Sequence, residues 1–167
     1  MYCFSAVHLL LYNKHKARQV MILDITRGFT KAQKYSLKNI INACIIKNVN
    51  CYVVGGAVRD AVLDISPRDI DICIDGDPNE LLELLKLKEY LNHPEFNTAW
   101  VKFNNDTEFD IIQCRKEIYQ CQGALPSVFP SSIYDDLKRR DFTINAIAFD
   151  LINEKLIDPF NGMKDIE

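Results

Sequence analysis

The stretch Cys51-Tyr52-Val53-Val54-Gly55-Gly56-Ala57-Val58-Arg59-Asp60 decides the fold of this 167-residue chain. Its first four residues are apolar and favour β structure, so they predict a buried strand over 51–54. The two glycines end that strand, because glycine accepts positive φ angles and lets a ligand approach the backbone closely. An apolar stripe at helical spacing then predicts a helix over 57–64. A strand, a Gly-Gly turn and a helix start together present free N–H groups to an anion.

Arg59 falls in the first turn of this helix, where a cation is unfavourable against the helix dipole. A bound phosphate would offset that cost, so Gly55, Gly56 and Arg59 are candidates for a phosphate cradle. Taken alone, the glycines are equally explained by an ordinary tight turn, and Asp60 by its fit to a helix start.

Two carboxylates follow at strand spacing, Asp69 and Asp71, within a predicted strand over 69–75. Alternate residues of a strand share a face, so these two carboxylates should lie roughly 7 Å apart on one face. Aspartate is disfavoured in strands, and like charges on one face repel each other. Asp110, in the strand-like segment 108–112, is a third candidate. Mg²⁺ takes carboxylate oxygens and bridges to substrate phosphates, so it would turn this repulsion into attraction.

A basic group, Lys138-Arg139-Arg140, stands immediately before a largely apolar stretch at 144–151. A solvated basic turn is the plain interpretation of such a group. Its place at the edge of a predicted core element favours phosphate binding through the arginines, because a guanidinium donates two parallel hydrogen bonds.

These segments resemble the signatures of the head domain of tRNA nucleotidyltransferases, the class II CCA-adding enzymes, which share a superfamily with bacterial poly(A) polymerases. The resemblance runs from about Cys51 to the last residue, and its motifs are specific. It implies an α/β nucleotidyltransferase head with a mostly antiparallel mixed sheet and helices mainly on one side. Further stretches resemble the same family: 93–99, 109–117, 123–126, 130–133 and 158–162.

The resemblance implies that Asp69 and Asp71 are Mg²⁺ ligands and that Asp110 is the third catalytic carboxylate. The implied reaction transfers nucleotides from CTP and ATP to the 3′ end of tRNA. The RNA 3′-hydroxyl attacks the α-phosphate and pyrophosphate leaves, with two Mg²⁺ ions roughly 3.5–4 Å apart. Residues 116–130 fall where the family has a flexible loop that helps to position the growing RNA end.

The resemblance also implies a nucleotide-binding set. Gly56 and Arg59 match contacts to the nucleotide triphosphate, and Gly55 shapes the turn. Arg140 matches a further contact to the nucleotide, and Arg139 is its neighbour in the motif.

The family continues beyond the head into a neck, whose acidic and arginine motif selects CTP or ATP, and then into a body and tail that grip the tRNA. No such motif follows the arginines here. We therefore expect a catalytic head at 31–162 and the start of a truncated neck at 163–167, with the neck, body and tail missing or separately encoded. The alternatives are poly(A) addition and a non-catalytic or partner-dependent head fragment that lacks base selection.

Composition fits one compact domain, with 48% hydrophobic residues. A net charge of −3 is not that of a stand-alone nucleic-acid-binding protein, which fits a head whose RNA-gripping parts lie elsewhere. The six cysteines contain no C-x-x-C pair, so no zinc site is expected. A reducing compartment is the simplest context for these cysteines. Trp100 flanks apolar residues at 99, 101 and 103, so we expect it to pack in the core and not to stack on a base.

Residues 1–30 lie outside the family pattern and are expected to form an N-terminal extension, either disordered or a targeting segment. Residues 4–12 are apolar but far too short to cross a membrane, so no stable membrane association is expected. Basic residues follow this run, whereas a secretory signal has them in front. We expect a cytoplasmic protein, with a mitochondrial or plastid location as the alternative if residues 1–30 are a presequence.

The remaining elements are predicted from hydrophobic periodicity and turn residues. In chain order they are a helix over 31–48, a helix over 78–88, strands near 99–103 and 107–114 joined by a turn at 104–106, a long loop, a helix around 131–138, a strand near 145–151 and a short strand over 156–158.

Overall fold

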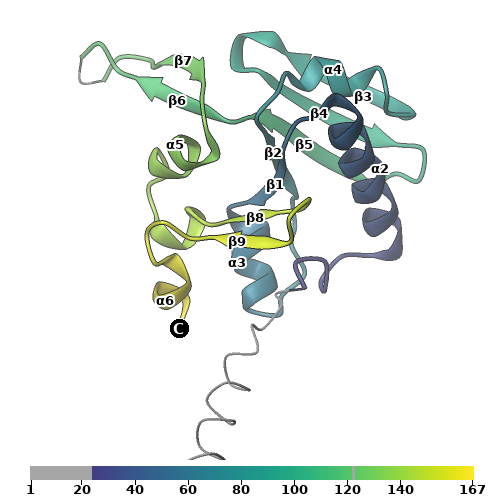
Figure 1. The fold of residues 1–167 in the computed structure, drawn as a ribbon, viewed down its shortest axis with the longest axis horizontal. Helices are drawn as coiled ribbons and strands as arrows, with labels where there is room; N and C mark the ends of the chain where they lie inside the picture. Colours follow the sequence, from purple (N-terminus) through teal and green to yellow (C-terminus); the bar gives the residue numbers. More distant parts are fainter. Residues whose placement is uncertain (1–23, 122) are drawn as a thin grey trace, which may run out of the picture.

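A mixed sheet runs through the computed structural model, which describes residues 24–121 and 123–167 (Figure 1). Its seven strands lie in the order β3-β4-β5-β2-β1-β8-β9, and β2 and β5 pair in parallel while the other neighbours are antiparallel. A second sheet consists of β6 and β7. The strands are β1 Cys51–Val54, β2 Asp71–Ile74, β3 Leu87–His93, β4 Thr98–Phe103, β5 Glu108–Gln113, β6 Arg115–Ile118, β7 Ser127–Pro130, β8 Ala148–Asp150 and β9 Lys155–Ile157.

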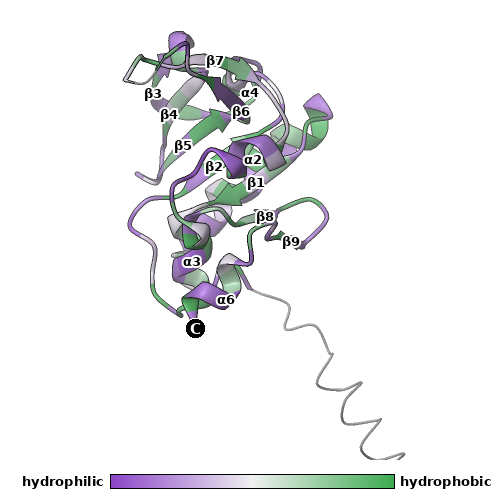
Figure 2. Cartoon of the chain, turned by 90° about the vertical axis from the view of Figure 1, so that its left-hand side faces the viewer, coloured by the Kyte–Doolittle hydropathy of each residue, from purple (hydrophilic) through white to green (hydrophobic). Residues whose placement is uncertain are grey.

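Helices cover mainly one face of the large sheet. The main core lies between this face and α2, α3 and α4, and a smaller core lies under α5 on the other face. Figure 2 shows the central strands mostly in the hydrophobic colour, as expected for strands that bury residues on both faces. The helices are α2 Lys31–Lys47, α3 Gly56–Val62, α4 Pro78–Leu82, α5 Ile133–Lys138 and α6 Gly162–Ile166, with short 3₁₀ turns η1 Pro94–Phe96 and η2 Thr143–Asn145. The predicted fold class is confirmed.

The long first helix is fixed at both ends by its own sequence. Thr30 caps α2 by accepting the Gln33 N–H, and the Gln33 side chain accepts the Thr30 N–H in return. Asn48 ends the helix in the left-handed conformation, where its amide bonds back to the last turn. The predicted helix over 31–48 is therefore confirmed to within a residue.

The predicted helix over 78–88 is wrong beyond Leu82. The chain turns after α4, buries Leu85 against the main core, and enters the strand β3 at Leu87. Strand β3 pairs antiparallel with β4 and completes the hydrogen bonds of an edge that would otherwise be unpaired. Tertiary pairing here overrides a sequence with good helix propensity.

Three other predicted segments also differ from the structure. The long loop over 116–130 is a hairpin, because its two ends pair as β6 and β7. The predicted strand over 107–114 ends at Gln113, and the buried Cys114 separates it from β6. The strand predicted near 145–151 is reduced to β8, because the residues before it form the turn η2.

Part of the expected N-terminal extension belongs to the domain. Ile25 and Phe29 are buried in the main core, and Arg27 pairs with Asp64 in the segment after α3. The rest of that extension, including the apolar run at 4–12, lies outside the described residues. Among the residues that are described, no helix has the length and hydrophobicity to cross a membrane.

The docking of α2 gives a stability prediction with a built-in control. Ile40 is fully buried in the main core, whereas Ile45, on the same helix, is 56% exposed. Ile40→Ala should lower the free energy of unfolding by about 2–5 kcal/mol, because it removes buried methyl groups and leaves a cavity. Ile45→Ala should change it by less than about 1 kcal/mol. Urea denaturation of both variants measures the difference, and equal losses would contradict the packing described here.

Candidate active site

Three aspartates meet at one end of the β2–β5 pair. Parallel pairing places Asp71 directly opposite Asp110, and both side chains lie on the face away from α2, because Ile72 and Ile111 bury on the other face. The strand β2 begins at Asp71, so the prediction that Asp69 lies within it is wrong. Asp69 belongs to the incoming segment, next to the point where the Asp110 N–H donates to the Ile70 carbonyl oxygen at 3.3 Å.

Burial and mutual repulsion act on these carboxylates. Burial raises the pKa of Asp71, and the negative charges of Asp110 and Asp69 raise it further, while Arg140 opposes the shift. Burial also raises the pKa of Asp110, together with the charges of Asp69 and Glu108. Repulsion of this kind remains unless a cation neutralises it.

The donor set fits a hard divalent cation that shares its coordination with a substrate. Within 24–121 and 123–167, no three His, Cys, Asp or Glu side chains come close enough to enclose a metal ion by themselves. Two carboxylates completed by substrate phosphate oxygens are a usual arrangement for Mg²⁺. Asp69 and Asp71 are the predicted pair.

The glycine turn lies beside the carboxylates and is covered by an arginine. Gly55 has a φ of 66°, a left-handed conformation that favours glycine. A Cβ atom at Gly55 would lie 2.8 Å from Nη1 of Arg140, so this guanidinium group lies directly against the glycine turn. The N–H groups of Gly56 and Ala57 open α3 and have no acceptor within that helix.

Arg59 is held in place by two side chains. Its Nη1 donates to Oδ1 of Asn145 at 2.8 Å, and its Nε and Nη2 donate to Oδ1 of Asp60 at 3.0 and 2.8 Å. The Asp60 carboxylate therefore neutralises this cation on the short helix α3. A bound phosphate is not required to offset the charge of Arg59, and its contact with a nucleotide stays a prediction. Sequence reasoning missed Asn145, which is 86 residues away in the chain.

One buried carboxylate, Asp136, holds both arginines of the basic group. Its Oδ1 accepts from Nε and Nη2 of Arg139 at 3.1 and 2.8 Å, and its Oδ2 accepts from Nε and Nη2 of Arg140 at 3.3 and 3.0 Å. Asp136 is fully buried, whereas Lys138 of the same basic group is exposed. No sequence pattern distinguished Asp136 from the acidic residue before it.

The remaining nitrogens separate the roles of the two arginines. Nη1 of Arg139 donates to Oε1 of Glu117 at 3.2 Å, and Glu117 also accepts from Arg115 and Tyr119. Burial acts to raise the pKa of Glu117, but the Tyr119 hydrogen bond and the two arginine charges outweigh it and lower that pKa. All three nitrogens of Arg139 are therefore engaged within the domain, while Nη1 of Arg140 faces Gly55. Of these two arginines, Arg140 is the better candidate for a nucleotide contact. The nitrogens of Arg59 are also paired, but Arg59, unlike Arg139, lines a cavity together with Asp69 and Asp71.

Two cavities adjoin the carboxylates and share Asp69. One, of about 440 Å³, is lined by Gly56, Arg59, Asp69 and Asp71 among others. The other, of about 520 Å³, lies between the segment before β2 and the β4–β5 hairpin and includes Asp69, Asp110 and Trp100. The carboxylates thus stand between two spaces, each large enough for part of a nucleotide.

Trp100 does not lie where the sequence predicted. Its neighbours Ala99 and Val101 are fully buried in the main core, so Trp100 points to the opposite face of β4. It is partly exposed and pairs directly with Asp110 across β4 and β5. The expectation of core packing is wrong, because residues that alternate along a strand occupy different faces.

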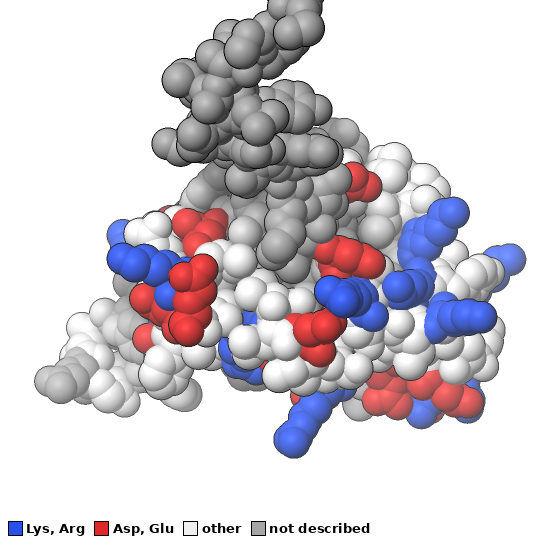
Figure 3. Space-filling model, turned by 90° about the horizontal axis from the view of Figure 1, so that it is seen from below, with Lys and Arg blue, Asp and Glu red and all other residues white. Residues whose placement is uncertain are grey.

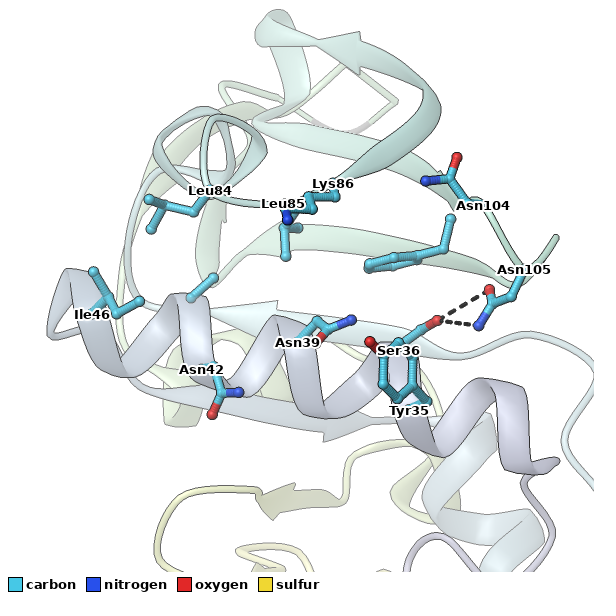
Figure 4. Close-up of a pocket in the computed structure, with 12 residues that line it drawn as sticks. Tyr35, Ser36, Asn39, Asn42, Ile46, Leu84, Leu85, Lys86, Asn104 and Asn105 are labelled. Atoms are coloured by element: carbon cyan, nitrogen blue, oxygen red, sulfur yellow. Dashed lines mark hydrogen bonds between the residues drawn. The ribbon is translucent and has the colours of Figure 1, made fainter.

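One further cavity among the described residues contains none of the carboxylates and arginines of the candidate site. A groove of about 490 Å³ lies between α2, the segment 84–86 that follows α4, and the β4–β5 turn, and its lining is mainly apolar and amide side chains, including Tyr35, Asn39 and Leu84 (Figure 4). The face in Figure 3 carries acidic and basic side chains close together on the left, and several basic side chains gather on the right. Asp75, which shares the strand spacing of Asp71, bonds instead to Asn50 at the far end of β2.

Known proteins similar to this chain are tRNA nucleotidyltransferases. The CC-adding tRNA nucleotidyltransferase of Deinococcus radiodurans is 36% identical over 121 residues, which cover 69% of this chain and 32% of that enzyme. The CCA-adding enzyme of Staphylococcus epidermidis is 39% identical over 132 residues, covering 78% and 31%. This chain spans about a third of the length of these relatives.

Solved structures agree with this similarity. An apo form of a CCA-adding enzyme superimposes with a TM-score of 0.75 at 34% identity, over 85% of this chain and 35% of that one. The Thermotoga maritima CCA-adding enzyme, solved with tRNA, gives a TM-score of 0.69 at 31% identity, over 85% and 32%. The poly A polymerase head domain matches residues 51–167, from the first strand of the sheet to the last residue. The chain therefore belongs to the poly A polymerase head domain family.

Proposed function

We propose that this chain is the catalytic head of an enzyme that adds nucleotides from CTP and ATP to the 3′ end of tRNA. The observation that carries the proposal is the Asp71–Asp110 pair, which stands between two cavities with Arg140 and the glycine turn beside it. One cavity suits a nucleoside triphosphate and the other suits an RNA end. The relatives named above as CC-adding and CCA-adding enzymes support tRNA as the acceptor.

The protein side chains would divide the work as follows. Asp69 and Asp71 would hold Mg²⁺, which when bound supplies charge neutralisation at the reacting phosphate. Arg140, the glycine turn and Arg59 would bind and orient the triphosphate, because guanidinium groups and free N–H groups both suit phosphate oxygens. A carboxylate oxygen of Asp110 would accept the proton of the RNA 3′-hydroxyl, a role that its raised pKa suits.

The carboxylate assignment predicts a loss of activity without a loss of fold. Asp71→Asn should lower Mg²⁺-dependent nucleotide incorporation into tRNA lacking its terminal CCA by about a hundredfold or more, because it removes a charge that the reaction needs. Asp75→Asn, the same change at the far end of β2, should leave the rate within about twofold. A primer-extension assay measures both. Wild-type activity in Asp71→Asn would overturn the metal assignment.

The same variant also has a predicted effect on stability without metal. Because the pKa of Asp71 is raised in the folded protein, ionising this group costs stability as the pH rises through that pKa. At neutral pH the free energy of unfolding of Asp71→Asn should thus equal or slightly exceed that of the wild type. Urea denaturation in EDTA at pH 4 and pH 7 measures this, and a larger deficit at pH 7 than at pH 4 would contradict it.

The arginine assignment predicts that variants lacking Arg59 or Arg140 bind both nucleotides more weakly. Arg59→Ala and Arg140→Ala should raise the KM for CTP and for ATP about tenfold or more, by equal factors, because both residues are assigned to phosphate and not to base. Lys138→Ala is the control, since this exposed residue belongs to the same basic group. Titration of each variant with both nucleotides measures the effect. A selective loss of one nucleotide would show that base recognition reaches these arginines.

The contacts of Asp136 with both arginines predict an effect on stability. Asp136→Asn should lower the free energy of unfolding by about 3–5 kcal/mol, because it leaves two partly buried guanidinium groups without their shared carboxylate. Asp135→Asn, the same change at an exposed neighbour, should cost less than about 1 kcal/mol. Urea denaturation measures both losses. If Asp136→Asn is as stable as Asp135→Asn, the shared carboxylate does not hold the arginine pair.

A further inference from the structure

A row of four residues crosses the sheet on the carboxylate face. Register pairs join Asp71 to Asp110, Asp110 to Trp100, and Trp100 to Leu91. Directly paired residues project to the same face of a sheet, and neighbouring strands lie about 4.8 Å apart. Trp100 therefore lies on the strand next to that of the catalytic carboxylate Asp110, and Leu91 lies on the following strand, at the edge of the sheet.

This row is available to a ligand. Trp100 is partly exposed, and Leu91, on the edge strand β3, is 59% exposed. The side chains next to this row along the strands project to the opposite face of the sheet, so they do not cover it; they are Tyr90, Ala99 and Val101. The cavity of about 520 Å³ that includes Asp69 and Asp110 also includes Trp100. An aromatic surface and a catalytic carboxylate thus line one space.

The charges around Trp100 favour a base over a phosphate. Lys102, two residues along the same face of β4, already pairs with Glu108 at 2.9 Å. Four carboxylates and one cation, Arg68, line this cavity, so the excess of negative charge disfavours a phosphate group; the carboxylates are Asp69, Asp106, Glu108 and Asp110. A nucleobase needs only an aromatic or apolar surface, and stacking on an aromatic side chain is a common source of affinity for single-stranded RNA.

We propose that Trp100 is the stacking platform for the base of the 3′-terminal nucleotide of the acceptor RNA, with Leu91 extending the platform outward. This inference rests on the proposed function, which places the RNA 3′-hydroxyl at Asp110. The incoming nucleotide belongs on the other side of Asp69, where the cavity is lined by Gly56 and Arg59. The platform positions the acceptor and does not take part in the chemistry.

Trp100 is the only tryptophan of the chain, so its fluorescence reports on this site alone. The probes are a short single-stranded RNA ending in C-C and the same RNA with an abasic 3′-terminal nucleotide, each titrated into the protein without nucleotide. The C-C probe should quench the fluorescence in a saturable way, and the abasic probe should not. Equal quenching by both probes, no quenching by either, or quenching by CTP alone would each overturn the inference.

Kinetics of variants separate this inference from the proposed function. Trp100→Ala should raise the KM for the RNA about tenfold or more and leave the KM for CTP within twofold, while Trp100→Phe should retain most of the affinity. Tyr35→Ala is the control, since it truncates an exposed aromatic on α2, away from the carboxylates. An active wild type with an unchanged KM for RNA in Trp100→Ala would overturn the platform alone. If the wild type, supplied with a neck, body and tail in cis or as a separate polypeptide, still incorporates no nucleotide into any RNA, the proposed function is overturned, and the fluorescence titration would still decide the platform.

Discussion

The parallel pairing of β2 with β5 is the constraint on which the site depends. It joins two strands that lie far apart in the chain and sets Asp71 opposite Asp110. A shift of one residue in this register would place one of the carboxylates in the apolar core, where Ile72 and Ile111 now lie. The buried isoleucines of the main core therefore fix the position of the charged groups on the opposite face. Packing and chemistry are set by the same pairing.

The basic side of the site is built on a different principle, in which one buried charge organises two others. Asp136 is fully buried, and its loss of hydration is offset mainly by the guanidinium groups of Arg139 and Arg140, with a further hydrogen bond from the Arg115 N–H. Arg139 is further tied to Glu117 on the β6–β7 hairpin, so it serves to hold the arrangement together. Arg140 keeps one nitrogen toward the glycine turn. Arg139 and Arg140 are neighbours in the chain but differ in their contacts: the first bonds to Glu117, and the second faces Gly55.

Elements that depend on residues within a few positions of one another were predicted correctly from the sequence. The strand over 51–54, the Gly-Gly turn and the capped helix α2 follow from apolar runs, glycine and capping residues within a few positions. The predictions failed where partners distant in the chain decide the outcome, as for β3, which forms because β4 offers a free edge. Strand spacing and the position of the basic group singled out the carboxylates and the arginines, and the resemblance to a family assigned their roles. Asn145 and Asp136 could not be predicted, because their importance lies in which arginines they contact. Trp100 was assigned to the wrong face, because the apolar residues beside it alternate with it.

The connection between β2 and β5 has a consequence for how the protein folds. Between Asp71 and Asp110 the chain forms α4, β3 and β4, so β5 returns to β2 only after that whole excursion is in place. Contacts between distant segments form late, because loop closure costs entropy before the contact is made. A partly folded copy therefore has all three aspartates but no site at which they meet. The site proposed to bind a metal ion, a nucleotide and an RNA end therefore forms only once β5 has paired with β2.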